Sequence, residues 1–264
     1  MGERRSYPNG TFSWVENATT DQGGAKSFYG TLFGWEFDDR PVGDGIVYSM
    51  AQLDGKNVAA ISPQMQDERE QGVPPHWNNY ITVERVDAVS EKVTELGGRL
   101  LASPFDVMDV GRMSVFMDPT GAVAFLWQAK SNIGAELVNV PGAFCWNELA
   151  TRDPAAAEQF YSQLFGWEFE RAGTDEGPPY WMIENDERRN GGMRQMGDEL
   201  PPGVPAHWLV YFAVDDVDAS SETATAAGAQ VMAPKISAGD FGSFAVFTDP
   251  AGAAFALFEG RLDD

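Results

Sequence analysis

Hydrophobic positions along the chain alternate between a period of two residues and a period close to 3.6. The pattern at the start predicts a strand on which Phe12, Trp14 and Glu16 share one face. Asp21 then stands as the N-terminal cap of a predicted helix that ends at Gly34. This helix carries an apolar stripe at helical spacing, formed by Ala25, Phe28, Tyr29, Leu32 and Phe33.

Three short apolar segments follow the helix and are separated by Gly, Pro and Asp turn formers. They lie near residues 35–37, 47–52 and 58–61. The same order of elements is predicted again over residues 78–128, with a strand, a helix that stops at Gly97 and three further strands. The first half of the chain is therefore predicted to contain two βαβββ modules.

The second half of the chain repeats the first. The ten residues from Phe28 to Phe37 return 132 positions later, at 160–169, with eight of ten positions identical. Asp118-Pro-Thr-Gly121 returns at an offset of 131 as Asp249-Pro-Ala-Gly252. Because this period exceeds that of solenoid repeats, each copy is predicted to be a domain with its own core. We place the first domain at residues 1–130, the linker at 131–143 and the second domain at 144–264.

Composition and charge limit the partners. The net charge of −22, from 40 acidic and 18 basic residues, opposes binding to nucleic acid, to anionic membrane surfaces and to strongly anionic ligands. Cys145 is the only cysteine, which excludes an intramolecular disulfide and a cysteine metal cluster. No secretory signal or apolar stretch of membrane-spanning length is found in the sequence. We expect a soluble cytoplasmic protein.

Three sets of motifs resemble the vicinal-oxygen-chelate superfamily of glyoxalases, bleomycin-resistance proteins and extradiol dioxygenases. They are the helix Phe-Tyr-x-x-Leu-Phe-Gly-Trp in both copies, the strand-to-helix turns at 83–87 and 214–218, and the two Asp-Pro-x-Gly turns. The resemblance covers the whole chain and is closest to a two-domain actinobacterial subgroup labelled glyoxalase-like or hydroxylase. It implies an α+β fold of tandem βαβββ modules, in which two glyoxalase-like domains curl mixed sheets into cups around a small-molecule site.

The resemblance also locates the positions at which metal-dependent members hold their ligands. These positions carry Trp14, Asn78 and Phe125 in the first domain, and Trp146, Leu209 and Ala256 in the second. Asn is at best a weak oxygen donor, and the other side chains cannot bind a metal. We therefore expect no metal or other cofactor, with a divalent metal kept as the alternative.

The chain has only two histidines, and each lies two residues before a metal-ligand position. We expect a slip of one or two residues to turn the strand register, so that His76 and His207 cannot replace the missing ligands. They are interpreted as loop-to-strand residues that hydrogen-bond locally. A role at the entrance of a ligand site stays open.

Strand parity predicts the lining of each cup. The first cup is expected to contain Trp14, Glu16, Asn78, Tyr80, Phe125 and Trp127. The second is expected to contain Trp146, Glu148, Leu209, Tyr211, Ala256 and Phe258. Such a lining suits a flat aromatic ligand, although the aromatic residues could instead fill a core. Burial among tryptophans should raise the pKa of Glu16 and Glu148, which could act as general acids or bases unless Arg or backbone amides satisfy them structurally.

Three functions follow from this pattern. The first is metal-independent binding of an aromatic or polyketide-like compound in one or both cups, for sequestration or assisted modification. The second is an enzyme of the same superfamily, either a glyoxalase-type aldehyde detoxifier or a hydroxylase- or lyase-like catalyst with Glu16 or Glu148 as acid or base. The third is an interaction protein whose cups are packed shut by Trp14, Trp127 and Trp146. Two joined domains match the module count of a homodimer of single-domain relatives, so both a monomer and a homodimer are consistent with the sequence.

Overall fold

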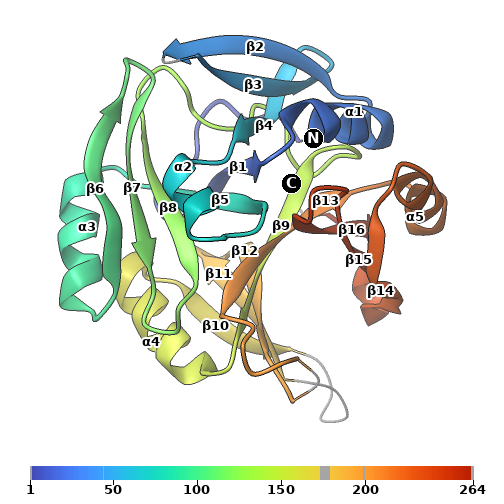
Figure 1. Cartoon of the computed structure of the whole chain (residues 1–264). Coiled ribbons are helices and arrows are strands. Elements are labelled where there is room, and N and C mark those ends of the chain that lie inside the picture. Colours follow the sequence, from blue (N-terminus) through green and yellow to red (C-terminus); the bar gives the residue numbers. More distant parts are fainter. Residues whose placement is uncertain (1, 44, 173–178, 199, 263–264) are drawn as a thin grey trace.

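The computed structural model describes residues 2–43, 45–172, 179–198 and 200–262, so the predicted limits Met1 and Asp264 lie outside the described residues. The described chain forms two eight-stranded sheets (Figure 1). The first contains β1 (Phe12–Thr19), β2 (Glu36–Gly43), β3 (Ile46–Leu53), β4 (Lys56–Pro63), β5 (His76–Thr82), β6 (Arg99–Val107), β7 (Gly111–Met117) and β8 (Val123–Ala129). The second contains β9 (Phe144–Thr151), β10 (Glu168–Ala172), β11 (Tyr180–Asn185), β12 (Arg188–Gln195), β13 (His207–Ala213), β14 (Gln230–Ser237), β15 (Gly242–Thr248) and β16 (Ala254–Gly260).

Both sheets have the same strand order. The first reads β2-β3-β4-β1-β5-β8-β7-β6, and the second reads β10-β11-β12-β9-β13-β16-β15-β14. The first strands of the two modules pair antiparallel at the centre, and each pairs in parallel with the last strand of its own module. The predicted α+β fold of four βαβββ modules is confirmed.

The longer helices lie where the apolar stripes predict them. They are α1 (Gln22–Phe33), α3 (Val86–Glu95), α4 (Pro154–Phe165) and α5 (Val217–Ala226). Two short segments, α2 (Gln66–Glu70) and a 3₁₀ turn at Gly239–Phe241, have no counterpart among the predictions. None of the helices in the described ranges is both long and apolar enough to cross a membrane.

Helices of one domain contact helices of the other, α1 beside α5 and α3 beside α4 (Figure 1). Near each contact, a tyrosine of one domain hydrogen-bonds to an aspartate of the other. The Tyr29 hydroxyl of α1 donates to Asp249 Oδ2 of the other domain at 3.0 Å and accepts from the Trp77 indole at 3.0 Å. Tyr161 repeats this arrangement with Asp118 Oδ2 at 2.9 Å. The aromatic helix of the repeat motif therefore joins the two domains.

The aspartates that receive these hydroxyls also hold their own turns. Asp118 Oδ1 accepts from the backbone N–H groups of Thr120, Gly121 and Ala122, and Asp249 does the same in the second Asp-Pro-x-Gly turn. Each aspartate therefore couples the geometry of a turn in one domain to the helix position in the other. Burial raises the pKa of Asp118, and its hydrogen bonds oppose this shift.

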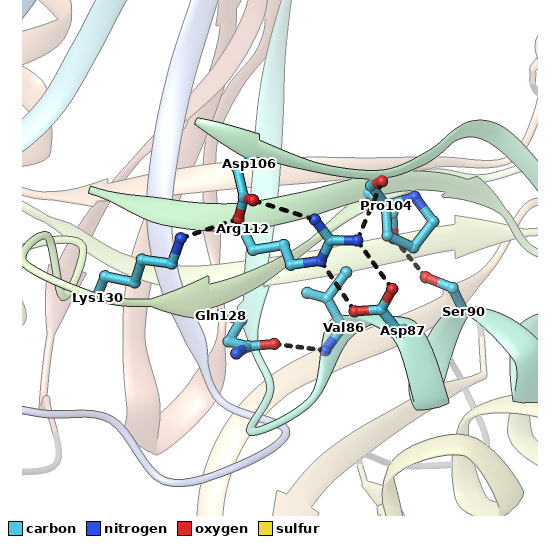
Figure 2. A network of polar contacts seen from close by, with 9 residues as sticks. Val86, Asp87, Ser90, Pro104, Asp106, Arg112, Gln128 and Lys130 are labelled. Carbon is cyan, nitrogen blue, oxygen red and sulfur yellow. Dashed lines mark hydrogen bonds and ion pairs between the residues drawn. The ribbon is translucent and has the colours of Figure 1, made fainter. Parts of the chain in front are cut away.

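On the outer face of the first sheet, an ion-pair network ties α3 to the strands beneath it (Figure 2). The Arg112 guanidinium forms two 2.9 Å hydrogen bonds to Asp87 at the start of the helix. Asp106 links Arg112 to Lys130, whose ammonium lies 2.9 Å away. Because these groups lie opposite the concave face, they position the helix and leave the cup to other side chains.

Because Tyr29 and Asp249 hydrogen-bond across the domain boundary, we expect substitutions at these two positions to be energetically coupled. Tyr29→Phe and Asp249→Asn should each lower the free energy of unfolding by about 1–3 kcal/mol, since each removes a hydrogen bond between buried groups. Urea unfolding of both single variants and the double variant should give a coupling of about 0.5–3 kcal/mol. The matched control, Tyr29→Phe with Asp118→Asn, should be additive. Equal coupling in both pairs would contradict the assignment.

Candidate functional site

Backbone pairing brings the predicted lining residues onto one face of each sheet. In the first domain, Trp14 lies opposite Tyr80, Glu16 lies opposite Asn78, and Phe125 lies beside Tyr80. The second domain repeats this arrangement, with Trp146 opposite Tyr211, Glu148 opposite Leu209, and Ala256 beside Tyr211. Each cup therefore has one carboxylate on its central strand, while the function of these side chains stays a prediction.

Glu16 is 9% exposed and hydrogen-bonded at both oxygens. Its Oε2 accepts from the Tyr80 hydroxyl at 2.6 Å and from the Tyr48 hydroxyl at 3.1 Å, and its Oε1 accepts from Ser62 at 2.5 Å. The Trp14 indole N–H in turn donates to the Tyr48 hydroxyl at 3.1 Å. Neutral hydroxyl groups, rather than the Arg or backbone amides considered from the sequence, satisfy this carboxylate.

Glu148 is contacted by the two corresponding phenols of its own domain and also by a positively charged side chain. It is 6% exposed, hydrogen-bonds with Tyr180 and Tyr211, and forms an ion pair with Arg194 at 3.2 Å. The Trp146 indole donates to the Tyr180 hydroxyl at 3.0 Å. Burial raises the pKa of Glu148, while Arg194 and the two phenols offset part of that rise.

The phenols around each carboxylate stay protonated. Burial, followed by the nearby negative charge of Glu148, raises the pKa of Tyr180 and Tyr211 well above the ordinary phenol value. Burial and Glu16 have the same effect on Tyr48 and Tyr80. The phenols therefore act as hydrogen-bond donors to the carboxylates at any ordinary pH.

Several residues of this arrangement were missed from the sequence. Tyr48 and Tyr180 lie on the third strands of their domains, and Ser62 and Arg194 end the strands that pair with the carboxylate strands. The two tyrosines match each other at the repeat offset of 132, as do Ser62 and Arg194. Extending strand parity to the predicted segment at 47–52 and to its repeat would have indicated the two tyrosines.

Gly192 explains how Tyr180 reaches the carboxylate. A Cβ at this position would lie 1.9 Å from the Tyr180 hydroxyl oxygen and 3.0 Å from the Trp146 indole nitrogen. Any side chain at this position would therefore displace the phenol. Glycine at this position leaves room for the close approach of the phenol.

The histidines begin the strands that carry Asn78 and Leu209. The prediction that a two-residue slip would turn the His76 and His207 side chains away from the metal-ligand positions was wrong. Residues two apart on a strand point to the same face. His76 pairs with Ala18 in the same register that pairs Asn78 with Glu16. The Nδ1 of each histidine lies 2.9 Å from a proline carbonyl oxygen, as the interpretation of local hydrogen bonding predicts. Burial, followed by the charge of Arg194, lowers the pKa of His207.

The residues at the three metal-ligand positions of each domain do not fit a metal ion. Indole, phenyl and aliphatic side chains fill five of the six positions, and Asn78 supplies the only amide. Across the described parts of the chain, no three His, Cys, Asp or Glu side chains come together as a potential metal site. The carboxylate of each cup is instead engaged by hydroxyl groups or by Arg194.

Two protein-family models match the chain. Residues 145–258 match a glyoxalase-like domain, and residues 11–124 match the glyoxalase/bleomycin resistance protein/dioxygenase superfamily. CFP32 of Mycobacterium tuberculosis, described as a candidate glyoxylase, is 48% identical over 98% of both chains. The anthracycline biosynthesis protein DnrV of Streptomyces peucetius is 32% identical over 97% of this chain and 95% of the relative.

Solved structures share the fold at low sequence identity. The Mn(II)-bound glyoxalase of Novosphingobium aromaticivorans is 15% identical, with a TM-score of 0.67 over 100% of this chain and 85% of that chain. The 2,2',3-trihydroxybiphenyl 1,2-dioxygenase of Sphingomonas wittichii is also 15% identical, with a TM-score of 0.67 over 97% of this chain and 92% of the dioxygenase chain. At this identity, the likeness shows the arrangement of the modules alone.

The raised pKa of Glu148 predicts a change in the pH dependence of stability. The folded protein holds this proton more tightly than the unfolded chain, so the associated stability is complete below the ordinary carboxyl pKa of 4.5 and is lost as pH rises through the folded value. Wild type should therefore lose stability relative to Glu148→Gln as pH increases above 4.5. Urea unfolding over a pH series checks this, with the exposed Glu158→Gln as control. A difference from Glu148→Gln that stays constant with pH would contradict it.

Proposed function

Since the chain belongs to the glyoxalase/bleomycin resistance protein/dioxygenase superfamily, we propose that it binds an aromatic or polyketide-like small molecule in its cups without a metal ion. The protein sequesters this compound or assists its modification. The proposal rests on one observation. Trp14 and Trp146 occupy metal-ligand positions, and each lies on the same strand face as a buried carboxylate that is hydrogen-bonded by hydroxyl groups.

The chemistry of the cups supports a flat and largely apolar ligand. Aromatic rings present faces for stacking, and the carboxylate with its phenols supplies a small polar group that can orient a bound molecule. The net charge of −22 disfavours strongly anionic compounds. Similarity to a protein named for anthracycline biosynthesis is consistent with a fused-ring compound.

An enzymatic function is the second candidate, and the environment of Glu148 favours it. A carboxyl with a raised pKa can hold or release a proton closer to neutrality, as a general acid or base must. Similarity to a candidate glyoxylase agrees with this possibility. Glu16 is the corresponding group of the first cup. If either carboxyl transfers a proton, the Glu→Gln variant should lose turnover and keep ligand binding, whereas unchanged turnover in both variants would remove the acid–base role.

We further propose that the protein acts in the cytoplasm as a monomer or homodimer, with neither nucleic acid nor membrane as a partner. Its acidic charge and its single cysteine support this setting. We likewise propose domains at 1–130 and 144–264 with a linker at 131–143, supported by the strands of the first sheet lying within residues 12–129 and those of the second within 144–260.

A neutral probe tests the binding function. Titration of chelator-treated protein with 1,8-dihydroxyanthraquinone should quench tryptophan fluorescence saturably, because Trp14 and Trp146 line the cups. The probe carries no charge at neutral pH, so the acidic field of the protein does not attract it nonspecifically. Adding Mn²⁺ or Zn²⁺ should leave the affinity unchanged.

Two results would contradict the proposal. The first is absence of saturable quenching by this probe and by a panel of other fused-ring aromatic compounds. The second is binding that appears only after a divalent metal is added. The second result would return the protein to the metal-dependent members of its superfamily.

A further inference from the structure

We propose that the second domain's cup is the ligand site, and that it takes a flat aromatic compound presenting a ketone or phenol oxygen to the Glu148–Arg194 pair. This inference rests on the proposed binding function and goes further by assigning the cup and the polar group of the ligand. It follows from four differences between two cups that share one backbone plan.

The first difference is in the exposure of matched aromatic rings. Trp14 and Trp127 of the first cup are only 4% and 6% exposed. Their counterparts Trp146 and Phe258 are half-buried. Tryptophan rings therefore close the first cup, whereas Trp146 of the second cup stays partly exposed.

The second difference lies in what fills the middle of each cup. In the first domain, Phe125 packs on the ring of Tyr80, whose hydroxyl binds Glu16, with ring centroids 4.6 Å apart. In the second domain, Ala256 occupies the matching place beside Tyr211. Tyr211 makes its ring contact with Phe244 of β15, two strands away, at 5.7 Å. The second cup therefore has no ring at the position that Phe125 occupies in the first.

The third difference is in the connection of each cup to the core. Trp14, Tyr80 and Trp127 belong to the main hydrophobic core, which extends through both domains. Trp127 is further fixed by an indole hydrogen bond to the Asn132 carbonyl and by close packing against Gly111. In the second cup, the apolar residues form a small cluster of their own, made of Leu209, Tyr211 and Ala256 with Trp146, Phe244, Val246, Phe258 and Cys145 packed around it.

This separation bears on function. The aromatic residues of the first cup contribute to the stability of the whole molecule, so a ligand could enter only by displacing core side chains. The second cluster presents partly exposed rings on one face of the sheet and lies outside that core. Apolar surface arranged in this way is typical of a binding site.

The fourth difference is electrostatic. Arg194 replaces Ser62 at the matching position, and its side chain is 29% exposed while it pairs with the 8% exposed Glu148 side chain. A guanidinium presents five N–H donors and can contact a carboxylate and a second acceptor at once. A ketone oxygen can accept from Arg194, and a phenol can donate to Glu148. An aromatic compound that carries such groups therefore matches both the rings and the polar end of this cup.

Calorimetric titration with 1,8-dihydroxyanthraquinone tests the assignment. Wild type should bind one probe molecule per chain. Arg194→Met should weaken binding by about tenfold or more, as expected for the loss of a charge-assisted hydrogen bond. Because this change leaves Glu148 buried and unpaired, Arg194→Met/Glu148→Gln should be measured as well, and it should show the same loss while keeping the native circular dichroism spectrum.

The control is Arg40→Met in the first domain. Arg40 pairs in register with Tyr48 on the cup side of β2, so it is the arginine of the first cup that corresponds most closely to Arg194. This variant should bind within twofold of wild type. Binding of two probe molecules per chain would overturn the assignment and leave the proposed function intact. So would weaker binding in Arg40→Met together with unchanged binding in both Arg194 variants. Absence of binding to wild type, both by this probe and by the panel of other fused-ring compounds, would instead refute the proposed function.

Discussion

A carboxylate on the concave face of a β-sheet must be paired or hydrogen-bonded, because an isolated buried charge costs several kcal/mol. This constraint shapes both cups. Two phenols reach each carboxylate, one from the adjacent strand and one from two strands away, and an indole N–H donates to the more distant phenol. Gly192 gives Tyr180 room to do so in the second domain. With these groups committed to the carboxylate, the metal-ligand positions around it hold mainly apolar side chains, and no group of three potential metal ligands occurs in the described residues.

The same requirement explains the motifs that repeat along the chain. The tyrosine of the aromatic helix hydrogen-bonds to the aspartate of the other domain's turn, and the tryptophan that follows the helix binds a glycine carbonyl, Gly142 for Trp35 and Gly10 for Trp167. These are the most visible family motifs, yet none of them lines a cup. They fix one sheet against the other. Recognition of the family and identification of the site therefore depend on different residues.

Much of the fold could be predicted from periodicity, and part of the site from strand parity. Alternation on the central strands placed Glu16 and Glu148 on the same faces as Trp14 and Trp146, because side chains on a strand have a period of two. Arg194 escaped notice because β12, with the sequence Arg-Arg-Asn-Gly-Gly-Met-Arg-Gln, has no apolar alternation and is a strand only through its pairing with β9 and β11. The tyrosine–aspartate contacts between domains could not be predicted, since a repeat shows that two copies exist and not which surfaces meet.

The central claim is that the cups hold an organic molecule where relatives hold a metal ion. Native mass spectrometry of freshly purified protein tests it directly, since the intact mass reveals both kinds of bound species. The account predicts a population that carries one small organic compound and no stoichiometric divalent metal. A stoichiometric divalent cation retained within either domain would contradict it.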